Sequence, residues 1–282
     1  MKVKSLLKNK DVSHKLIILA TFFLLVIFFS IMKPSYASYD NIMTILLATC
    51  VNGLLALGCS FVIITGGIDI SVGTVMTFSC VMSGTAFTVW HFPIWLAILF
   101  GFLVGTLCGA INGFAVAKMM LPPFIATMAM QMITKGLSLV VSGIKPVYFT
   151  GADGYQNIAI GSNEEAARLS GIKVNQWKIG IYALCGLFCG VAGLVMSSRL
   201  NSAQPQLGPG YELEAIAAAV IGGNSLTGGE GSIVGTLIGA LIISSLTNGL
   251  RIMAVSTEIQ SAIVGLVLAL AVFFDQMRRK KG

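Results

Sequence analysis

Residues 92–117 read FPIWLAILFGFLVGTLCGAINGFAVA and contain no charged side chain. A helix of about 20 apolar residues crosses the hydrocarbon core of a bilayer, so this stretch is long enough to cross once. Its glycines at positions 101, 105, 109 and 113 recur every fourth residue and share one face of a helix. Small residues at this spacing let membrane helices pack closely. The same spacing recurs in two later segments, at Gly186 and Gly190 and at Gly231, Gly235 and Gly239.

The composition extends this pattern to the whole chain. Of its 282 residues, 56% are hydrophobic and 10% are charged, whereas about 25% are charged in a typical soluble domain. The mean hydropathy of +0.88 excludes a soluble protein of this size. We therefore expect an all-α, polytopic membrane protein with about eight or nine transmembrane or re-entrant helices. The predicted apolar segments are Leu16–Met32, Ile42–Thr65, Asp69–Val89, Phe92–Ala117, Pro122–Ser142, Ile179–Ser198, Leu213–Ile221, Ile233–Leu250 and Ile259–Phe274.

The net charge of +7 is concentrated next to the apolar segments. Five lysines lie in the first fifteen residues, and residues 278–281 are Arg-Arg-Lys-Lys. Positive residues in these places fix the orientation of membrane proteins and touch anionic lipid, so we do not expect a nucleic-acid partner. The basic residues 1–15 and the tail 276–282 are expected on the cytoplasmic side, with a single transmembrane domain over residues 16–275 between them.

The sequence contains no recognisable constellation for metal binding or catalysis. All six cysteines fall inside apolar segments without Cys-x-x-Cys spacing, and we interpret them as small membrane residues. His14 and His91 are too far apart in the sequence to suggest a local metal site. We therefore predict neither a metal site nor a catalytic site in this chain.

Two glycine-rich stretches interrupt the apolar pattern. Residues 66–74 read GGIDISVGT and residues 228–236 read GGEGSIVGT, which agree at five of nine positions. Each places glycines, then Asp or Ser, ahead of an apolar helix, as at the N-terminus of a half-helix. Discontinuous helices at matching places in two halves indicate a transport path. Ordinary turns between spans would have the same composition. A different alignment of the two halves, which pairs residues 105–110 with residues 235–240, matches equally well.

Polar residues inside apolar segments are candidates for such a path, because each is costly unless it faces water or a partner. Lys135 also lies within a segment and has to reach an interface, pair or line a cavity. The alternative role for each candidate is a hydrogen bond between helices, worth about 0.6 kcal/mol on average. The candidates are Asn52, Asp69, Ser71, Asn112, Gln131 and Asn248.

A long polar stretch, residues 143–178, separates the fifth and sixth apolar segments. Within it, residues 161–172 read GSNEEAARLSGI. Asn163 can cap a short helix, Glu164 and Glu165 are favoured in its first turn, and Gly171 is placed to end it. The stretch predicts a short amphipathic helix outside the bilayer, although a solvated loop could have the same composition.

This stretch resembles the cytoplasmic coupling loop of ATP-binding-cassette importer permeases. Over nearly its whole length, the chain is similar to the permease subunits for ribose and related monosaccharides. The resemblance is specific for the family and weak for the individual sugar. It rests on Gly66–Gly73, Leu121–Thr127, Asn163–Ile172, Arg199–Pro205, Gly210–Leu213, Ile221–Gly223 and Gly228–Thr236.

The resemblance implies a transport subunit of the bacterial inner membrane that is not itself an enzyme. A cytoplasmic ATPase would dock on the coupling loop, an extracytoplasmic binding protein would deliver the sugar, and a second permease copy would complete the path. No Gly-x-x-x-x-Gly-Lys-[Ser/Thr] sequence is present, so ATP is expected on the partner and no cofactor in this chain. The residues implied for the coupling loop, within residues 157–173, are Asn163, Glu164, Glu165, Ala166, Ala167, Arg168 and Gly171.

The number of crossings departs from that family pattern. With the N-terminal lysines inside, five crossings place Lys118 inside and the stretch after Gly143 outside, whereas the coupling loop should be inside. The family ordinarily has a further span at this place, and none is visible here. Either residues 143–156 are pulled through the membrane, or one half inserts inverted, or the chain is a deleted, non-functional relative. An ion-coupled secondary transporter is a further alternative, which would need several intramembrane acids.

Overall fold

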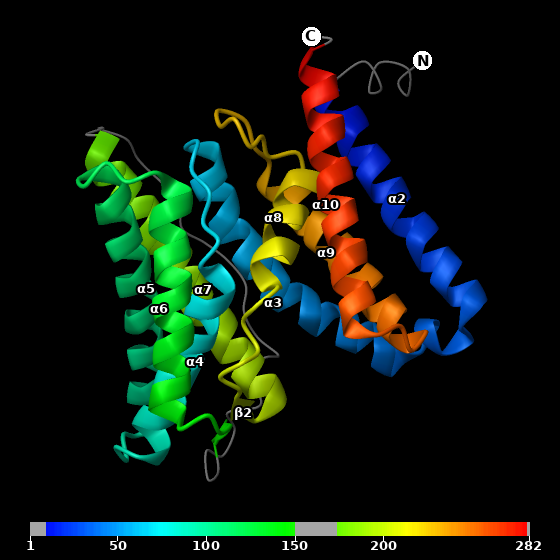
Figure 1. Ribbon diagram of the computed structural model, residues 1–282. Coiled ribbons are helices and arrows are strands. Elements are labelled where there is room, and N and C mark those ends of the chain that lie inside the picture. The colour runs from blue at the N-terminus through cyan, green and yellow to red at the C-terminus, as the bar shows by residue number, and fades with distance from the viewer. Residues whose placement is uncertain (1–9, 150–173, 281–282) are drawn as a thin grey trace. The chain divides into compact units, whose positions relative to one another are not determined.

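The computed structural model describes residues 10–149 and 174–280. This part of the chain contains nine α-helices (Figure 1), and seven of them are long and apolar enough to cross a membrane. Each predicted apolar segment is a helix, so the all-α polytopic fold is confirmed. The elements are α2 (Lys10–Met32), the 3-10 helix η1 (Pro34–Ala37), α3 (Tyr39–Ile64), α4 (Val72–Thr88), α5 (Ile94–Ala117), α6 (Pro123–Ser142), β1 (Val147–Tyr148), α7 (Val174–Leu200), β2 (Ser202–Ala203), α8 (Tyr211–Ile221), α9 (Ile233–Ile252) and α10 (Thr257–Lys280).

Local sequence signals set several of the helix ends. Pro123 occupies the first turn of α6, where its missing N–H costs nothing. Gly143 ends the same helix with φ of 59°, a left-handed conformation that glycine adopts without strain. The Ser38 hydroxyl accepts a hydrogen bond from the backbone N of Asn41 and so caps α3.

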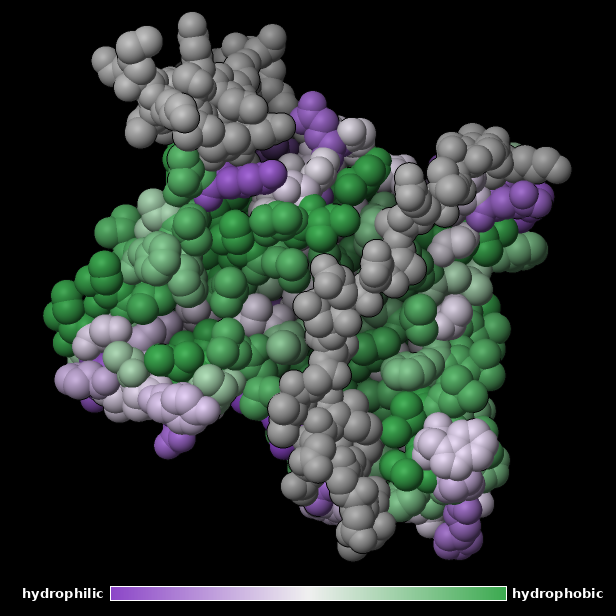
Figure 2. Space-filling model, turned by 180° about the vertical axis from the view of Figure 1, so that it is seen from behind, coloured by the Kyte–Doolittle hydropathy of each residue, from purple (hydrophilic) through white to green (hydrophobic). Residues whose placement is uncertain are grey.

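Large apolar side chains cover much of the helix surface. In Figure 2, green apolar side chains occupy broad areas of the visible helices. Leu24 is 67% exposed, Ile31 76% and Met132 71%. Such exposure would be costly in water, but it is ordinary for helix faces that contact lipid tails.

The chain divides into two compact units. Unit 2 is the continuous stretch Gly67–Glu212, and unit 1 combines Met1–Gly66 with Leu213–Gly282.

In unit 2, the predicted glycine series on α5 lies directly against α7. A Cβ added at Gly105 would lie 2.5 Å from the carbonyl oxygen of Gly186, and one at Gly113 would lie 2.6 Å from the Cα of Ile179. Residue numbers rise along α5 as they fall along α7, so the two helices are antiparallel. The series thus serves close helix packing, as predicted.

Helices α6 and α7 run in the same direction. Helix α6 follows α5 through a short turn at residues 118–122 and runs back along the unit. Strands β1 and β2, which follow α6 and α7 respectively, pair with Val147 opposite Ala203, so the C-terminal ends of both helices lie together. Residues 149 and 174 are therefore at opposite ends of α7, about 40 Å apart for a helix of 27 residues. A coupling loop on the cytoplasmic side, as the resemblance implies, would require this same direction.

In unit 1, α3 and α9 are antiparallel and α8 lies against both. Asn52 of α3 contacts Ser244 of α9, and Ser60 contacts Thr236. Helix α8 has only 11 residues, about 16 Å, which is half of a bilayer core. The aromatic and aliphatic side chains of Phe29, Tyr36, Ile45 and Leu250 form a separate buried cluster near η1.

Candidate translocation path

Three predicted path residues meet at the first glycine-rich break, in unit 2. The backbone N and the hydroxyl of Ser71 donate hydrogen bonds to Asp69 Oδ1 at 2.8 and 2.6 Å. Asn112 Nδ2, from α5, donates to Ser71 Oγ at 3.0 Å. All three side chains are at most 3% exposed. Because Ser71 binds the Asp69 carboxylate and Asn112 of α5 binds Ser71, this cluster holds the start of α4 against α5.

Gln131, the fourth predicted residue, pairs with an acid that the sequence reading did not single out. Its Nε2 donates to Glu212 Oε1 at 3.2 Å, and the backbone N of Gly210 donates to Glu212 Oε2 at 3.0 Å. Gln131 lies near the middle of α6, so the Glu212 carboxylate is held well inside the span. Lys135, one turn further along α6, is exposed and is close enough to act electrostatically on Glu212.

Asn52, the fifth candidate, lies in unit 1 and also pairs with an acid. Its Nδ2 donates to Glu214 Oε2 at 2.8 Å and to Ser244 Oγ at 3.0 Å. Asn248, the sixth candidate, lies one turn beyond Ser244 on α9 and is 6% exposed. Glu214 was missed because hydropathy does not reveal that α8 begins at the depth of the centre of α3.

Asn224, which lies between α8 and α9, holds the second glycine-rich stretch in place. Asn224 is fully buried, and its Nδ2 contacts Ser60 Oγ at 3.0 Å and Thr236 Oγ1 at 2.6 Å. Its Oδ1 accepts from the backbone N of Ser232 at 3.2 Å, and the Ser232 hydroxyl caps α9. Ser71 makes no such cap on α4. Both stretches open helices, as predicted, but they do so with different hydrogen bonds, so the internal repeat stays a hypothesis.

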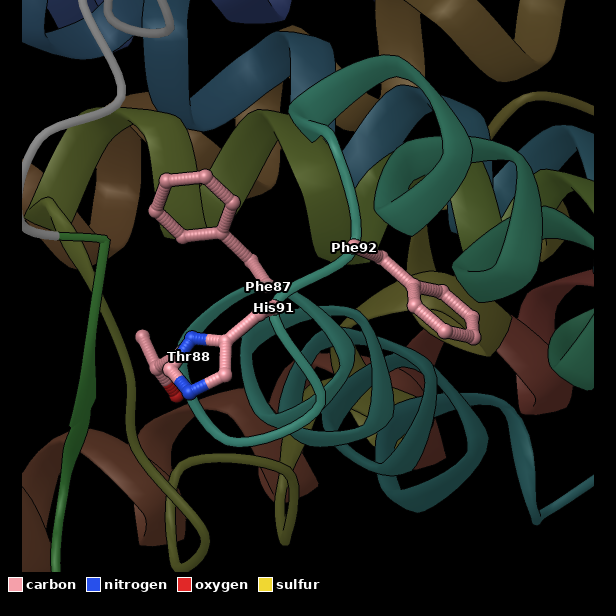
Figure 3. A pocket seen from close by; sticks show the side chains of 4 residues that line it. All are labelled: Phe87, Thr88, His91 and Phe92. Atoms are coloured by element: carbon pink, nitrogen blue, oxygen red, sulfur yellow. The ribbon is translucent and has the colours of Figure 1, made fainter.

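A shallow hollow elsewhere in unit 2 lacks the candidate residues. It is lined by Phe87, Thr88, His91 and Phe92 at the turn between α4 and α5. Figure 3 shows the His91 imidazole beside Thr88, with the Phe92 ring on the other side. Since this hollow is at a helix end, it is not part of the predicted path.

The predicted coupling loop lies outside the described residues. This applies to all of its members, Asn163, Glu164, Glu165, Ala166, Ala167, Arg168 and Gly171. Among the described cysteines, Cys185 and Cys189 are buried one turn apart on α7. Among the described residues, no group of three or more His, Cys, Asp or Glu side chains could hold a metal ion.

Buried polar side chains within a bundle of apolar helices define the class of this protein, a polytopic helical membrane protein. Residues 41–153 and 150–272 match the family described as branched-chain amino acid transport system / permease component. The chain belongs to this permease family. It is the transmembrane subunit of an ATP-binding-cassette transporter and not an enzyme, and ATP binds to a partner subunit.

Curated relatives show which permeases of this family the chain resembles. The Bacillus subtilis (strain 168) ribose import permease protein is 40% identical over 91% of this chain and 91% of its own. The Escherichia coli (strain K12) ribose import permease protein is 36% identical over 89% and 90%, and the L-arabinose transport system permease protein of the same strain is 33% identical over 93% and 90%. No solved structure matches the chain.

The alignment with the Bacillus subtilis relative also shows a difference in length. The alignment with the B. subtilis relative has 293 positions but uses 91% of the 282 residues, about 257, which leaves about 36 positions (293 − 257) without a counterpart here. The two family matches meet at residues 150–153, between α6 and α7. A helical crossing needs about 20 residues, so 36 positions are enough for one span and its connections.

Proposed function

We propose that this chain forms the translocation path for a monosaccharide such as ribose, as the permease subunit of an importer. The observation that supports this most is the family match over residues 41–272, together with similarity to permeases named for ribose, arabinose and fructose. Amides and carboxylates at the middle of the spans, such as Asn52 with Glu214, supply the polar contacts that a sugar needs when it leaves water.

The proposed assembly has two copies of this permease or one copy with a related permease, a cytoplasmic ATPase, and an extracytoplasmic binding protein. The basic ends of the chain, residues 1–15 and 276–282, would face the cytoplasm. The ATPase would dock on the predicted coupling loop, at residues 163–168.

Reconstitution of the complex in liposomes tests this proposal. ATP-dependent uptake of ribose, arabinose or fructose is expected, with competition between them ranking the substrates. Glu164→Ala with Arg168→Ala should abolish uptake and binding of the ATPase, whereas Lys118→Ala, in another loop, should preserve both. A wild-type complex that binds the ATPase but transports none of the three sugars would contradict the proposal. Uptake that follows an ion gradient without ATPase would identify a secondary transporter.

The direction of α6 and α7 favours a second candidate, an internally shortened permease that inserts without transporting. The C-terminal ends of these helices are joined by β1 and β2, and the B. subtilis relative has about 36 positions, enough for a span, without a counterpart in this chain. In such a permease, the polar connection between α6 and α7 would have to cross the membrane in place of a span. Burying its polar backbone groups in hydrocarbon would cost much free energy.

Cysteine labelling on either side of the connection tests this candidate. In a cysteine-free background, Lys145→Cys and Lys178→Cys are treated with a membrane-impermeant maleimide in intact and in permeabilised cells. We expect only Lys145→Cys to react in intact cells, because the two helices run in the same direction. Reaction of both positions in intact cells would mean that α7 inserts inverted, contrary to the pairing of β1 with β2. Sugar uptake by the intact complex would exclude the non-transporting form.

A further inference from the structure

Two amide oxygens in unit 1 are buried without a hydrogen-bond partner among the described residues. They are Asn52 Oδ1 and Asn248 Oδ1, on side chains that are 3% and 6% exposed. Burying a polar atom in this way costs stability, and native proteins keep few such atoms. The orientation of Asn52 is fixed by its partners, because exchanging its O and N would place Oδ1 against the Glu214 carboxylate.

Asn52 lies at the depth where the short helix α8 starts, and Asn248 lies one turn away along α9. Asn52 is residue 14 of the 26 in α3, and its partner Ser244 is residue 12 of the 20 in α9. Asn248 is one turn from Ser244 and shares its face of α9. Glu214, in the first turn of α8, meets Asn52 there. Substrate sites of membrane transporters commonly lie at this depth, beside the ends of broken helices.

We propose that Asn52, Glu214 and Asn248 bind the hydroxyl groups of the transported sugar. The proposal rests on the proposed function and assigns to it a substrate-contact site. The unpartnered amide atoms and the carboxylate are all acceptors, so the ligand has to bring several donors. The hydroxyl groups of a monosaccharide do so without carrying a charge into the membrane. A monovalent cation is the competing ligand for oxygen atoms and is distinguished in the test.

The site is closed in this structure. Asn52 is buried, and its Nδ2 is bound to Glu214 on one side and to Ser244 on the other. Entry of a sugar therefore requires the first turn of α8 to move away from α3. Sugar hydroxyl groups would then replace the contact between Asn52 and Glu214 and also satisfy the two amide oxygens, which stabilises the open form only while sugar is bound.

The test compares a site residue with a neighbour on the same helix turn. Asn248→Leu removes an unpartnered acceptor, so we expect its melting temperature in detergent to be equal to or above that of the wild type. Its maximal sugar uptake in liposomes should fall at least tenfold, while ATP hydrolysis stimulated by the binding protein is retained. The Thr247 hydroxyl donates to the Ile243 carbonyl of its own helix, so Thr247→Ala should leave uptake unchanged. Glu214→Gln should lower uptake as Asn248→Leu does.

Each remaining outcome would overturn the site. Normal uptake by both Asn248→Leu and Glu214→Gln would do so, and so would an equal loss in Thr247→Ala. A lower melting temperature in Asn248→Leu would show that this amide is structural. If uptake by the wild type depends on sodium and uptake by Glu214→Gln does not, the oxygen atoms of the proposed site bind a cation and not a sugar. If the wild-type complex transports no sugar, the proposed function itself fails. The melting temperature still tests the site in that case, because a value for Asn248→Leu below that of the wild type refutes it.

Discussion

Replacement of Gly105 by alanine should separate α5 from α7. The added Cβ would lie 2.5 Å from the carbonyl oxygen of Gly186 and 2.9 Å from the backbone N of Gly190. Ordinary contact begins at 3.4 Å, so the backbones have to move apart by about 0.9 Å (3.4 − 2.5). Backbone cannot yield as a flexible side chain can, and overpacking of this kind costs about 1–3 kcal/mol.

The matched control is Gly136→Ala on α6, where a Cβ meets no atom within 4 Å. In a helix, alanine is favoured over glycine by about 1 kcal/mol, so the control should be as stable as the wild type or more stable. Gly105→Ala has the same gain in helix propensity, so its unfolding free energy should lie about 1–3 kcal/mol below that of the control.

Native cysteines provide the assay. Cys108, Cys185 and Cys189 are at most 7% exposed and lie on the two helices of this contact, so a thiol-reactive fluorophore reports its opening during a thermal ramp in detergent. The reasoning is refuted if Gly105→Ala melts at the same temperature as Gly136→Ala. Gly186→Ala, which meets Gly105 from the other side, should repeat the loss.

Three further changes test local features by the same thermal assay. Asn224→Ala should cost about 1–3 kcal/mol, because it leaves Ser60 and Thr236 without their buried amide partner; an unchanged melting temperature would show that these hydroxyl groups satisfy one another. Ser232→Ala should cost about 1 kcal/mol by removing the cap of α9, and Ser232→Asp should restore most of it. Gly143→Ala should cost about 1 kcal/mol, because Gly143 has φ of 59°; a gain in stability would mean that α6 ends differently.

The helices could be predicted from the sequence because lipid imposes a simple rule. Each long apolar run has to satisfy its own backbone in hydrocarbon and therefore becomes a helix. Glycine spacing then predicted the packed face of α5, since only small residues allow the approach seen between Gly105 and Gly186. The direction of α7 relative to α6 could not be predicted, because the number of visible crossings conflicted with a cytoplasmic coupling loop.

The polar contacts could be predicted only in part. Asp69, Ser71 and Asn112 were identified because each is polar inside an apolar segment, but their mutual bonding depends on how α4 and α5 meet. Glu214 was missed because its depth is set by the fold of the chain before α8. Asn224 was missed because a polar residue in a glycine-rich turn looks solvated until its burial is known.

The two-residue pairing of β1 with β2 has a consequence for the order of assembly during synthesis. Val147 cannot meet Ala203 until α7 has been made and inserted, so the end of α6 emerges without its partner strand. Phe149, which is 2% exposed and packs on Phe87 of α4, depends on the same closure. Unit 2 therefore stays incomplete after α4 to α6 have been inserted. A chain arrested before residue 203 should be cleaved by proteases at this end more readily than the full-length protein.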